Sequence, residues 1–243
     1  VAVGKSALGA DTLGSRSVAI GAFALQAQNF TTATNAFNVA VGCDAGLLVT
    51  TGVENTLIGG LSGDALTDAD MNVAIGYLAL TADTKGSKSV AIGKEALATQ
   101  NFTTSTDTFN TAVGHNAGNS VTTGIQNTLI GALAGDAATT RNGNTAVGYS
   151  ALTADAKGEG SVAVGSSALS AQNYGTDTNA FNTGVGYFAG AAITTGVQNT
   201  ILGAIAGDAL TDADNNTALG YVALGQCVLG LSLIHISEPT RLR

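Results

Sequence analysis

The sequence predicts an all-β protein built as a parallel solenoid of about 13 coils. Two observations support this prediction: a glycine that recurs at a nearly constant interval, and a short β-branched segment directly before each of these glycines. A chain that repeats one strand-sized unit in the same phase is typical of solenoids, in which each coil stacks on the previous one. We therefore expect one coil for each recurring glycine.

The recurring glycines, called motif glycines below, are usually 17 residues apart. Every fourth coil is a longer, 21-residue coil, so four successive coils make a larger 72-residue repeat. Glycine suits a bend at which a Cβ atom would clash, so we interpret these residues as structural turn glycines. They are Gly4, Gly21, Gly42, Gly59, Gly76, Gly93, Gly114, Gly131, Gly148, Gly165, Gly186, Gly203 and Gly220.

The three residues before each motif glycine form a short strand pattern. The first is Val or Thr in every coil, the second is mostly Ala, and the third is Val, Ile or Leu. β-Branched residues in such a short run favour a strand, whereas an amphipathic helix needs apolar residues at three- and four-residue steps. Asn or Ser stands one residue further back, where its side chain suits a corner that leads into the strand.

These three positions define rows along the solenoid: a valine/threonine row, an alanine row and an isoleucine/valine row. Alternate side chains of a strand face opposite ways. We expect the two branched rows to point inward, with Val41, Val113 and Val185 buried, and the alanine row to point outward. An apolar stripe on the outside calls for a partner, so the pattern predicts a homo-oligomer.

The segments "SVAIGAFAL" at 17–25, "SVAIGKEAL" at 89–97 and "SVAVGSSAL" at 161–169 resemble the YadA-like head repeat of trimeric autotransporter adhesins. Similar "NTAVG" arrays occur in phage tail-fibre proteins. The resemblance covers residues 1–225 and implies a left-handed parallel β-roll that assembles as a homotrimer. Because the usual family repeat is shorter than 17 residues, the loop opposite the motif is expected to be longer here.

The resemblance implies a structural and adhesive fibre segment, with further copies of this chain and a host cell-surface glycan or protein as partners. The leading interpretation is part of a phage tail fibre on a virion. The alternative is the head of a bacterial trimeric autotransporter adhesin on the outer surface of a cell. We expect no cofactor.

Composition argues against several other functions. The formal net charge is −8, with only 9 Lys and Arg, which disfavours binding to nucleic acid. Charged or turn-forming residues interrupt every apolar run well before the ~18 residues that a membrane-spanning helix requires. His115 stands at a variable position, so a general base for an enzyme is lacking. A solenoid enzyme acting on polysaccharide and an ice-binding protein, suggested by the threonines, remain less favoured alternatives.

Two groups of residues are candidates for binding. The four-residue insertions each carry two aromatic side chains, which suit contacts with sugars or protein surfaces or, alternatively, pack on the roll. These aromatics are Phe30, Phe37, Phe102, Phe109, Tyr174 and Phe181. Weak calcium candidates are Asp68 and Asp70, matched by Asp212 and Asp214, although the spacing departs from the EF-hand pattern.

The repeat is expected to stop near residue 230. The next motif glycine is due at position 237, where Ser237 stands, and Leu233 replaces the expected Asn. Residues 231–243 resemble a translated sequencing adapter, so we interpret residues 1–230 as the roll and 231–243 as a non-native tail. We expect this tail to show no register with the roll.

Overall fold

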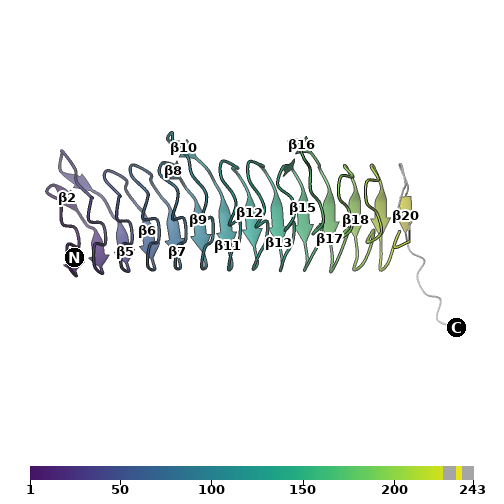
Figure 1. The fold of residues 1–243 in the computed structure, drawn as a ribbon, viewed down its shortest axis with the longest axis horizontal. Helices are drawn as coiled ribbons and strands as arrows, with labels where there is room; N and C mark the ends of the chain where they lie inside the picture. Colours follow the sequence, from purple (N-terminus) through teal and green to yellow (C-terminus); the bar gives the residue numbers. More distant parts are fainter. Residues whose placement is uncertain (227–233, 237–243) are drawn as a thin grey trace. The chain divides into compact units, whose positions relative to one another are not determined.

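The computed structural model describes residues 1–226 and 234–236, and these residues form strands and turns without a helix. The chain divides into two compact units, Val1–Asn127 and Thr128–Arg243. Each unit is a parallel β-solenoid, in which successive coils contribute one short strand each to a sheet (Figure 1). The prediction of an all-β parallel solenoid is confirmed. Within the described residues, no helix is long and apolar enough to span a bilayer.

In the first unit, seven strands pair in parallel along the sheet. Each residue lies beside its equivalent one coil further on, as Ala40 lies beside Leu57. The strands are β1 (Ala2–Val3), β3 (Val18–Ile20), β5 (Val39–Val41), β6 (Thr56–Ile58), β7 (Val73–Ile75), β9 (Val90–Ile92) and β11 (Thr111–Val113).

The second unit repeats this arrangement, with Ala146 beside Ala163 and Gly184 beside Ile201. Its strands are β12 (Thr128–Ile130), β13 (Thr145–Val147), β15 (Val162–Val164), β17 (Thr183–Val185), β18 (Thr200–Leu202), β19 (Thr217–Leu219) and β20 (Ile234–Ile236).

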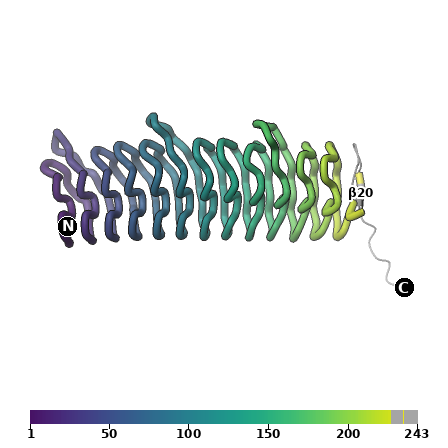
Figure 2. Tube along the Cα trace, viewed as in Figure 1, coloured from purple at the N-terminus to yellow at the C-terminus, as the bar shows by residue number. Residues whose placement is uncertain are grey.

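The three longer coils carry a small additional sheet. In each case a two-residue strand of one coil pairs in parallel with a two-residue strand of the next. The longer loops protrude beyond the neighbouring coils of their unit (Figure 2). The pairs are β2 (Gly14–Ser15) with β4 (Thr34–Asn35), β8 (Gly86–Ser87) with β10 (Thr106–Asp107), and β14 (Gly158–Glu159) with β16 (Thr178–Asn179).

The alanine row faces the interior, opposite to the expectation from the sequence. Ala40, Leu57 and Ala112 are fully buried, whereas Val41 and Val113 are only partly buried. The prediction that the branched rows, including Val185, point inward and the alanine row outward is therefore wrong. Strand alternation shows that neighbouring side chains face opposite ways, but it does not show which set faces inward.

The narrow interior of each coil explains this arrangement. Large core side chains also come from the position four residues after the motif glycine, where Leu25, Leu80 and Leu97 are fully buried. In three of the coils with glycine at that position, the large side chain comes from the alanine row instead, as Leu57, Leu129 or Ile201. In the others both positions are small and leucines of adjacent coils fill the space: a Cβ atom on Gly46 would lie 2.7 Å from Leu57 and 3.0 Å from Leu25. The interior therefore holds at most one large side chain per coil from these two facing positions, and two facing branched side chains would overfill it.

Asparagines at the corner before most strands of the main sheet form a buried ladder. Asn38 donates from Nδ2 to the Gly52 carbonyl at 2.7 Å, and its Oδ1 accepts the backbone N–H of Asn55 in the next coil at 2.9 Å. Asn55 and Asn72 repeat the second bond at 3.0 Å. The corner role expected from the sequence is present, but these bonds join residues 14 and 17 positions apart rather than groups within one turn.

Strand β20 lies within the segment 231–243, which was expected to show no register with the roll. Ile234–Ile236 pairs in parallel with β19, and Ala218 lies beside His235, one coil length further on. The prediction that no part of 231–243 is in register with the roll is wrong for these three residues, because a strand edge offers backbone partners to almost any sequence. The rest of the expected tail lies outside the described residues.

Candidate functional surfaces and the buried polar network

The exposed face of the main sheet is apolar along one row and mixed along the other, because Thr stands at seven of the 13 positions of the valine/threonine row. It consists of the valine/threonine and isoleucine/valine rows, because the alanine row is turned inward. Exposed fractions are, for example, 41% at Ile20 in the first unit and 44% at Leu202 in the second. The alanine stripe expected on the outside is absent from the described surface, and the two branched rows are uncovered in its place. We call these two rows the sheet face.

The aromatic residues of the protruding loops divide into two groups. Phe30, Phe102 and Tyr174 are buried, with exposed fractions of 5–8%, so they pack beneath their loops and do not offer a binding surface. The prediction that these three residues bind at the surface is therefore wrong. The second aromatic of each loop is exposed, at 46% for Phe37, 52% for Phe109 and 53% for Phe181. Only these three remain candidates for surface contacts.

Two of the exposed rings are accompanied by cations. The guanidinium carbon of Arg16 lies 5.3 Å from the centroid of the Phe37 ring, and Lys88 Nζ lies 5.4 Å from that of Phe109. A cation on one face of a ring restricts its motion and leaves the other face available. In the third loop Gly160 takes the place of the cation, since a Cβ atom on it would lie 2.7 Å from Phe181.

A buried polar network holds each protruding loop. In the middle copy, Gln100 donates from Nε2 to Asp83 Oδ2 at 2.6 Å and accepts at Oε1 from Asn110 Nδ2 at 2.8 Å. Asp83 Oδ1 also accepts the backbone N–H groups of Gly86 and Phe102, both at 3.0 Å. Because Phe102 belongs to the inserted segment, this carboxylate joins the loop to the coil beneath it.

Burial raises the pKa of the Asp83 carboxyl above its usual range, while hydrogen bonds from Gln100, Phe102 and Gly86 oppose this shift. The folded state therefore holds the Asp83 proton more tightly than the unfolded chain does. The contribution of this group to stability is present at low pH and declines as the pH rises from the ordinary Asp pKa through the raised one.

We expect the free energy of unfolding of the wild type, minus that of Asp83→Asn, to fall as the pH rises through this window and then to level off. The variant cannot titrate at this position, so the difference isolates the Asp83 carboxyl. Urea unfolding at a series of pH values measures it. A difference that grew with pH would show that folding favours the carboxylate.

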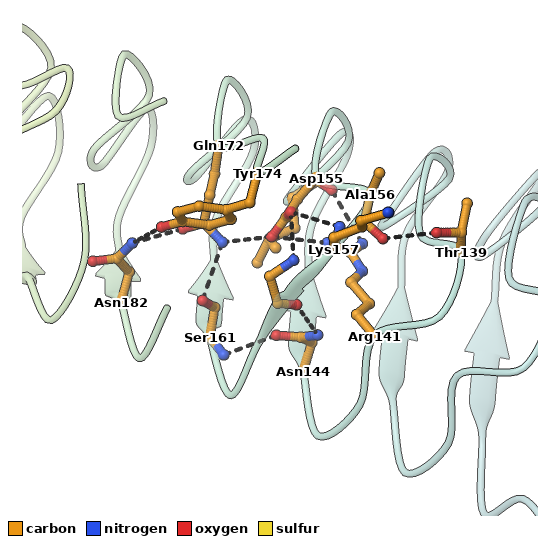
Figure 3. Close-up of polar contacts among 12 residues, drawn as sticks. Thr139, Arg141, Asn144, Asp155, Ala156, Lys157, Ser161, Gln172, Tyr174 and Asn182 are labelled. Atoms are coloured by element: carbon orange, nitrogen blue, oxygen red, sulfur yellow. Dashed lines mark hydrogen bonds and ion pairs between the residues drawn. The ribbon is translucent and has the colours of Figure 1, made fainter. Parts of the chain in front are cut away.

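The third network contains an ion pair that the sequence analysis did not anticipate (Figure 3). Arg141 and Asp155 are both buried, with Arg141 Nη1 3.2 Å from Asp155 Oδ2, and Arg141 Nη2 donates to the Leu152 carbonyl at 3.3 Å. Burial lowers the pKa of Arg141 and the adjacent Asp155 opposes that shift. Gln172 donates to Asp155 Oδ2 at 2.6 Å, as in the other loops.

Tyr174, which belongs to the protruding loop, joins the same network (Figure 3). Its hydroxyl donates to the Gly196 carbonyl at 2.6 Å and accepts from Asn182 Nδ2 at 3.1 Å. Burial, with a smaller contribution from Asp155, raises the pKa of the Tyr174 hydroxyl, so it remains a neutral donor. Tyr174 therefore anchors the loop from inside.

The aspartates proposed as weak calcium candidates mainly stabilise turns. Asp70 and Asp214 each accept a backbone N–H from the preceding coil at 2.8 Å, and Asp68 pairs with Lys85 Nζ at 3.4 Å. Asp212 accepts from the Thr211 hydroxyl at 3.1 Å. Among the described residues, no three carboxylate, histidine or cysteine side chains are grouped so as to hold a metal ion.

Four tyrosines directly after motif glycines are exposed, and they were not among the residues predicted to bind. Their exposed fractions are 51% for Tyr77, 57% for Tyr149, 56% for Tyr187 and 70% for Tyr221. Three of them recur at the four-coil interval of the loops, a signal that the sequence already contained. We call the residues directly after the motif glycines the post-glycine row.

Comparison with known proteins does not add to this description. No protein-family model, curated protein or solved structure matches the chain. The surfaces of the molecule are therefore the basis for inferring its function.

Proposed function

We propose that the protein is a structural and adhesive fibre segment that assembles as a homotrimer through its sheet face and attaches to a host cell surface. A phage tail fibre is the leading setting, and the head of a bacterial trimeric autotransporter adhesin is the alternative. The proposal assigns the chain no catalytic role. The partner on the cell is a surface glycan or protein.

The apolar sheet face carries this proposal. Isolated apolar side chains are normal on a protein surface, but a continuous array is usually covered by a partner. Here the array repeats with every coil, from Ile20 and Ile58 in the first unit to Ile130 and Leu202 in the second. A second copy presents the same array in the same register, which makes the chain a suitable partner for itself.

Closed rotational symmetry favours a small ring of copies. In a ring each copy covers the face of its neighbour and none is left uncovered, whereas an open arrangement continues to grow. The number three comes from the resemblance to trimeric adhesin and tail-fibre repeats. The exposed Phe37, Phe109 and Phe181 then supply aromatic contacts that act together, because several weak contacts on one particle bind far more strongly than one alone.

The corrected strand orientation also supports a second candidate, an ice-binding surface. Threonines of the valine/threonine row were expected inside the coil, but Thr56 and Thr128 are partly exposed and Thr200 is exposed. They form part of a regular face on which successive residues of a row lie ~4.8 Å apart. Trimer assembly and ice binding use the same face, so a single experiment separates them.

We expect light scattering of the purified chain to give three times the chain mass. Ile58→Lys and Ile130→Lys, one in each unit, should dissociate the trimer at concentrations at which the wild type stays assembled, because a lysine buried in an apolar interface is costly to desolvate. Thr123→Lys, at an exposed loop position, is the matched control and should remain trimeric.

A monomeric wild type would overturn the assembly proposal. If that monomer also inhibited ice recrystallisation, and Thr128→Lys abolished the effect, the second candidate would replace the first.

A further inference from the structure

The post-glycine row of the second unit alternates between tyrosine and small residues. Tyr149, Tyr187 and Tyr221 lie on every second coil, and Ser166 and Ala204 occupy the coils between them. All three tyrosines have more than half of their surface exposed, at 57%, 56% and 70%. The row therefore presents three separate rings with room on either side of the middle one.

Backbone hydrogen bonds fix this row in register. The carbonyl of each row residue accepts the N–H of the residue that follows the row in the next coil, at 2.8–3.1 Å. Two coils at ~4.8 Å each therefore separate successive tyrosines by ~10 Å. The bonds join Ser167 to Tyr149, Phe188 to Ser166, Ile205 to Tyr187 and Val222 to Ala204.

The row lies beside the sheet face rather than on it. Gly148, at a φ of +134°, and Gly186, at +138°, take the chain out of the strand, and the tyrosines stand in the turns that follow. Phe188 packs edge-on against Tyr187, with ring centroids 4.5 Å apart and an interplanar angle of 68°. This contact limits the movement of the middle ring.

We propose that Tyr149, Tyr187 and Tyr221 form a binding platform for an extended, neutral β-1,4-linked glycan. This proposal deepens the adhesive function above and rests on it. Exposed tyrosines offer a rigid apolar face to a pyranose ring and a hydroxyl to its neighbours. They lose little conformational entropy on binding, because they have few rotatable bonds.

The alternation in the row suits this class of glycan. Neighbouring rings of an extended β-1,4 chain are turned over by about half a turn, so every second ring presents the same face to a flat partner. The ~10 Å spacing of the tyrosines is close to the length of two such rings. Ser166 and Ala204, which are small, leave space for the intervening sugars.

Charge in the row favours a neutral glycan. In the second unit, every residue of the row from Ala132 to Tyr221 is uncharged. In the first unit, by contrast, the row contains Lys5, Lys94 and His115, and its single tyrosine, Tyr77, stands between Gly60 and Lys94. The first unit therefore lacks the repeated rings and provides an internal control.

Isothermal titration of the full chain with cellohexaose and with N-acetylchitohexaose tests the platform. At least one of these hexasaccharides should bind, and more tightly than its disaccharide, which can cover only one ring. Maltohexaose, whose α-1,4 linkages curve the chain, should bind more weakly. Replacing Tyr149, Tyr187 and Tyr221 together by Ala should weaken binding at least about tenfold. Tyr77→Ala should change it by less than about twofold.

Light scattering of the same samples separates this inference from the assembly proposal. A trimer that binds neither hexasaccharide, or a triple variant that binds as well as the wild type, overturns the platform alone. A monomer that binds the glycan through these tyrosines overturns the assembly alone. A triple variant that no longer assembles would show that the tyrosines belong to the interface between copies, and this too would overturn the platform.

Discussion

Gly59→Ala is expected to lower the free energy of unfolding by about 3 kcal/mol or more. Gly59 has a φ of +132°, which side chains with a Cβ atom rarely adopt. A Cβ atom there would lie 2.5 Å from the carbonyl oxygen of Gly76. The Gly76 carbonyl accepts the N–H of Ala79, and the Gly76 N–H donates to the Ile58 carbonyl, so this backbone cannot move aside cheaply.

The next residue provides a matched control. A Cβ atom on Gly60 would meet nothing closer than the Tyr77 ring at 3.6 Å, an ordinary contact. Gly60→Ala should therefore leave stability within about 1 kcal/mol of the wild type, and the loss of glycine flexibility in the unfolded chain acts in its favour. Urea unfolding followed by circular dichroism compares the two variants. If Gly59→Ala proves insoluble while Gly60→Ala folds, the prediction is supported; equal stabilities would contradict it.

Arg141→Ala is expected to destabilise the second unit by about 3–5 kcal/mol, because it removes one partner of a buried ion pair and leaves the buried Asp155 carboxyl without its cation. It also empties space in the core. A Cβ atom on Gly135 would lie 2.8 Å from Arg141 Nη2. At the equivalent glycines, Gly63 and Gly207, the nearby atom is instead a Leu66 or a Leu210 methyl carbon.

Comparison of the equivalent positions in the two units suggests a second substitution that restores the stability lost in Arg141→Ala. Leu66 and Ala69 in the first unit are replaced by Ala138 and Arg141 in the second, so the arginine fills the volume that a leucine fills elsewhere. Ala138→Leu alone should cost about 1–3 kcal/mol by overfilling the core. Combined with Arg141→Ala it should recover stability, giving a favourable coupling of at least about 1 kcal/mol in a double-mutant cycle. Strictly additive effects would show that the two sites do not share this space.

Periodicity made the coils and their strands predictable from the sequence. Spacing alone located β6 and β13, because a glycine after a β-branched triplet allows few other structures. The direction of the side chains was not predictable in the same way. Alternation permits either face to be inside, and Ala40 lies in a narrow interior that Leu25 and Leu57 of the adjacent coils already fill.

The exposure of the binding candidates was likewise not predictable from the sequence. Phe30 and Phe37 belong to one inserted segment and have similar chemistry, yet one is 5% and the other 46% exposed, a difference set by the loop anchored to Asp11 and Gln28. Arg141 in the core could not be expected from its type, since charged residues are rarely buried. Only comparison with Leu66 and Ala69, one large repeat earlier, explains its position.

The one-coil reach of the hydrogen bonds has a further consequence for inheritance. The asparagine ladder and the motif glycines bond or contact only the adjacent coil, so a block of four coils carries complete ends that fit another copy of the same block. Unequal recombination between such blocks in the gene would add or remove four coils, ~19 Å of stack, in one event and without a new interface. The length of the solenoid can therefore change during evolution in steps of four coils, while each loop keeps its position within its block.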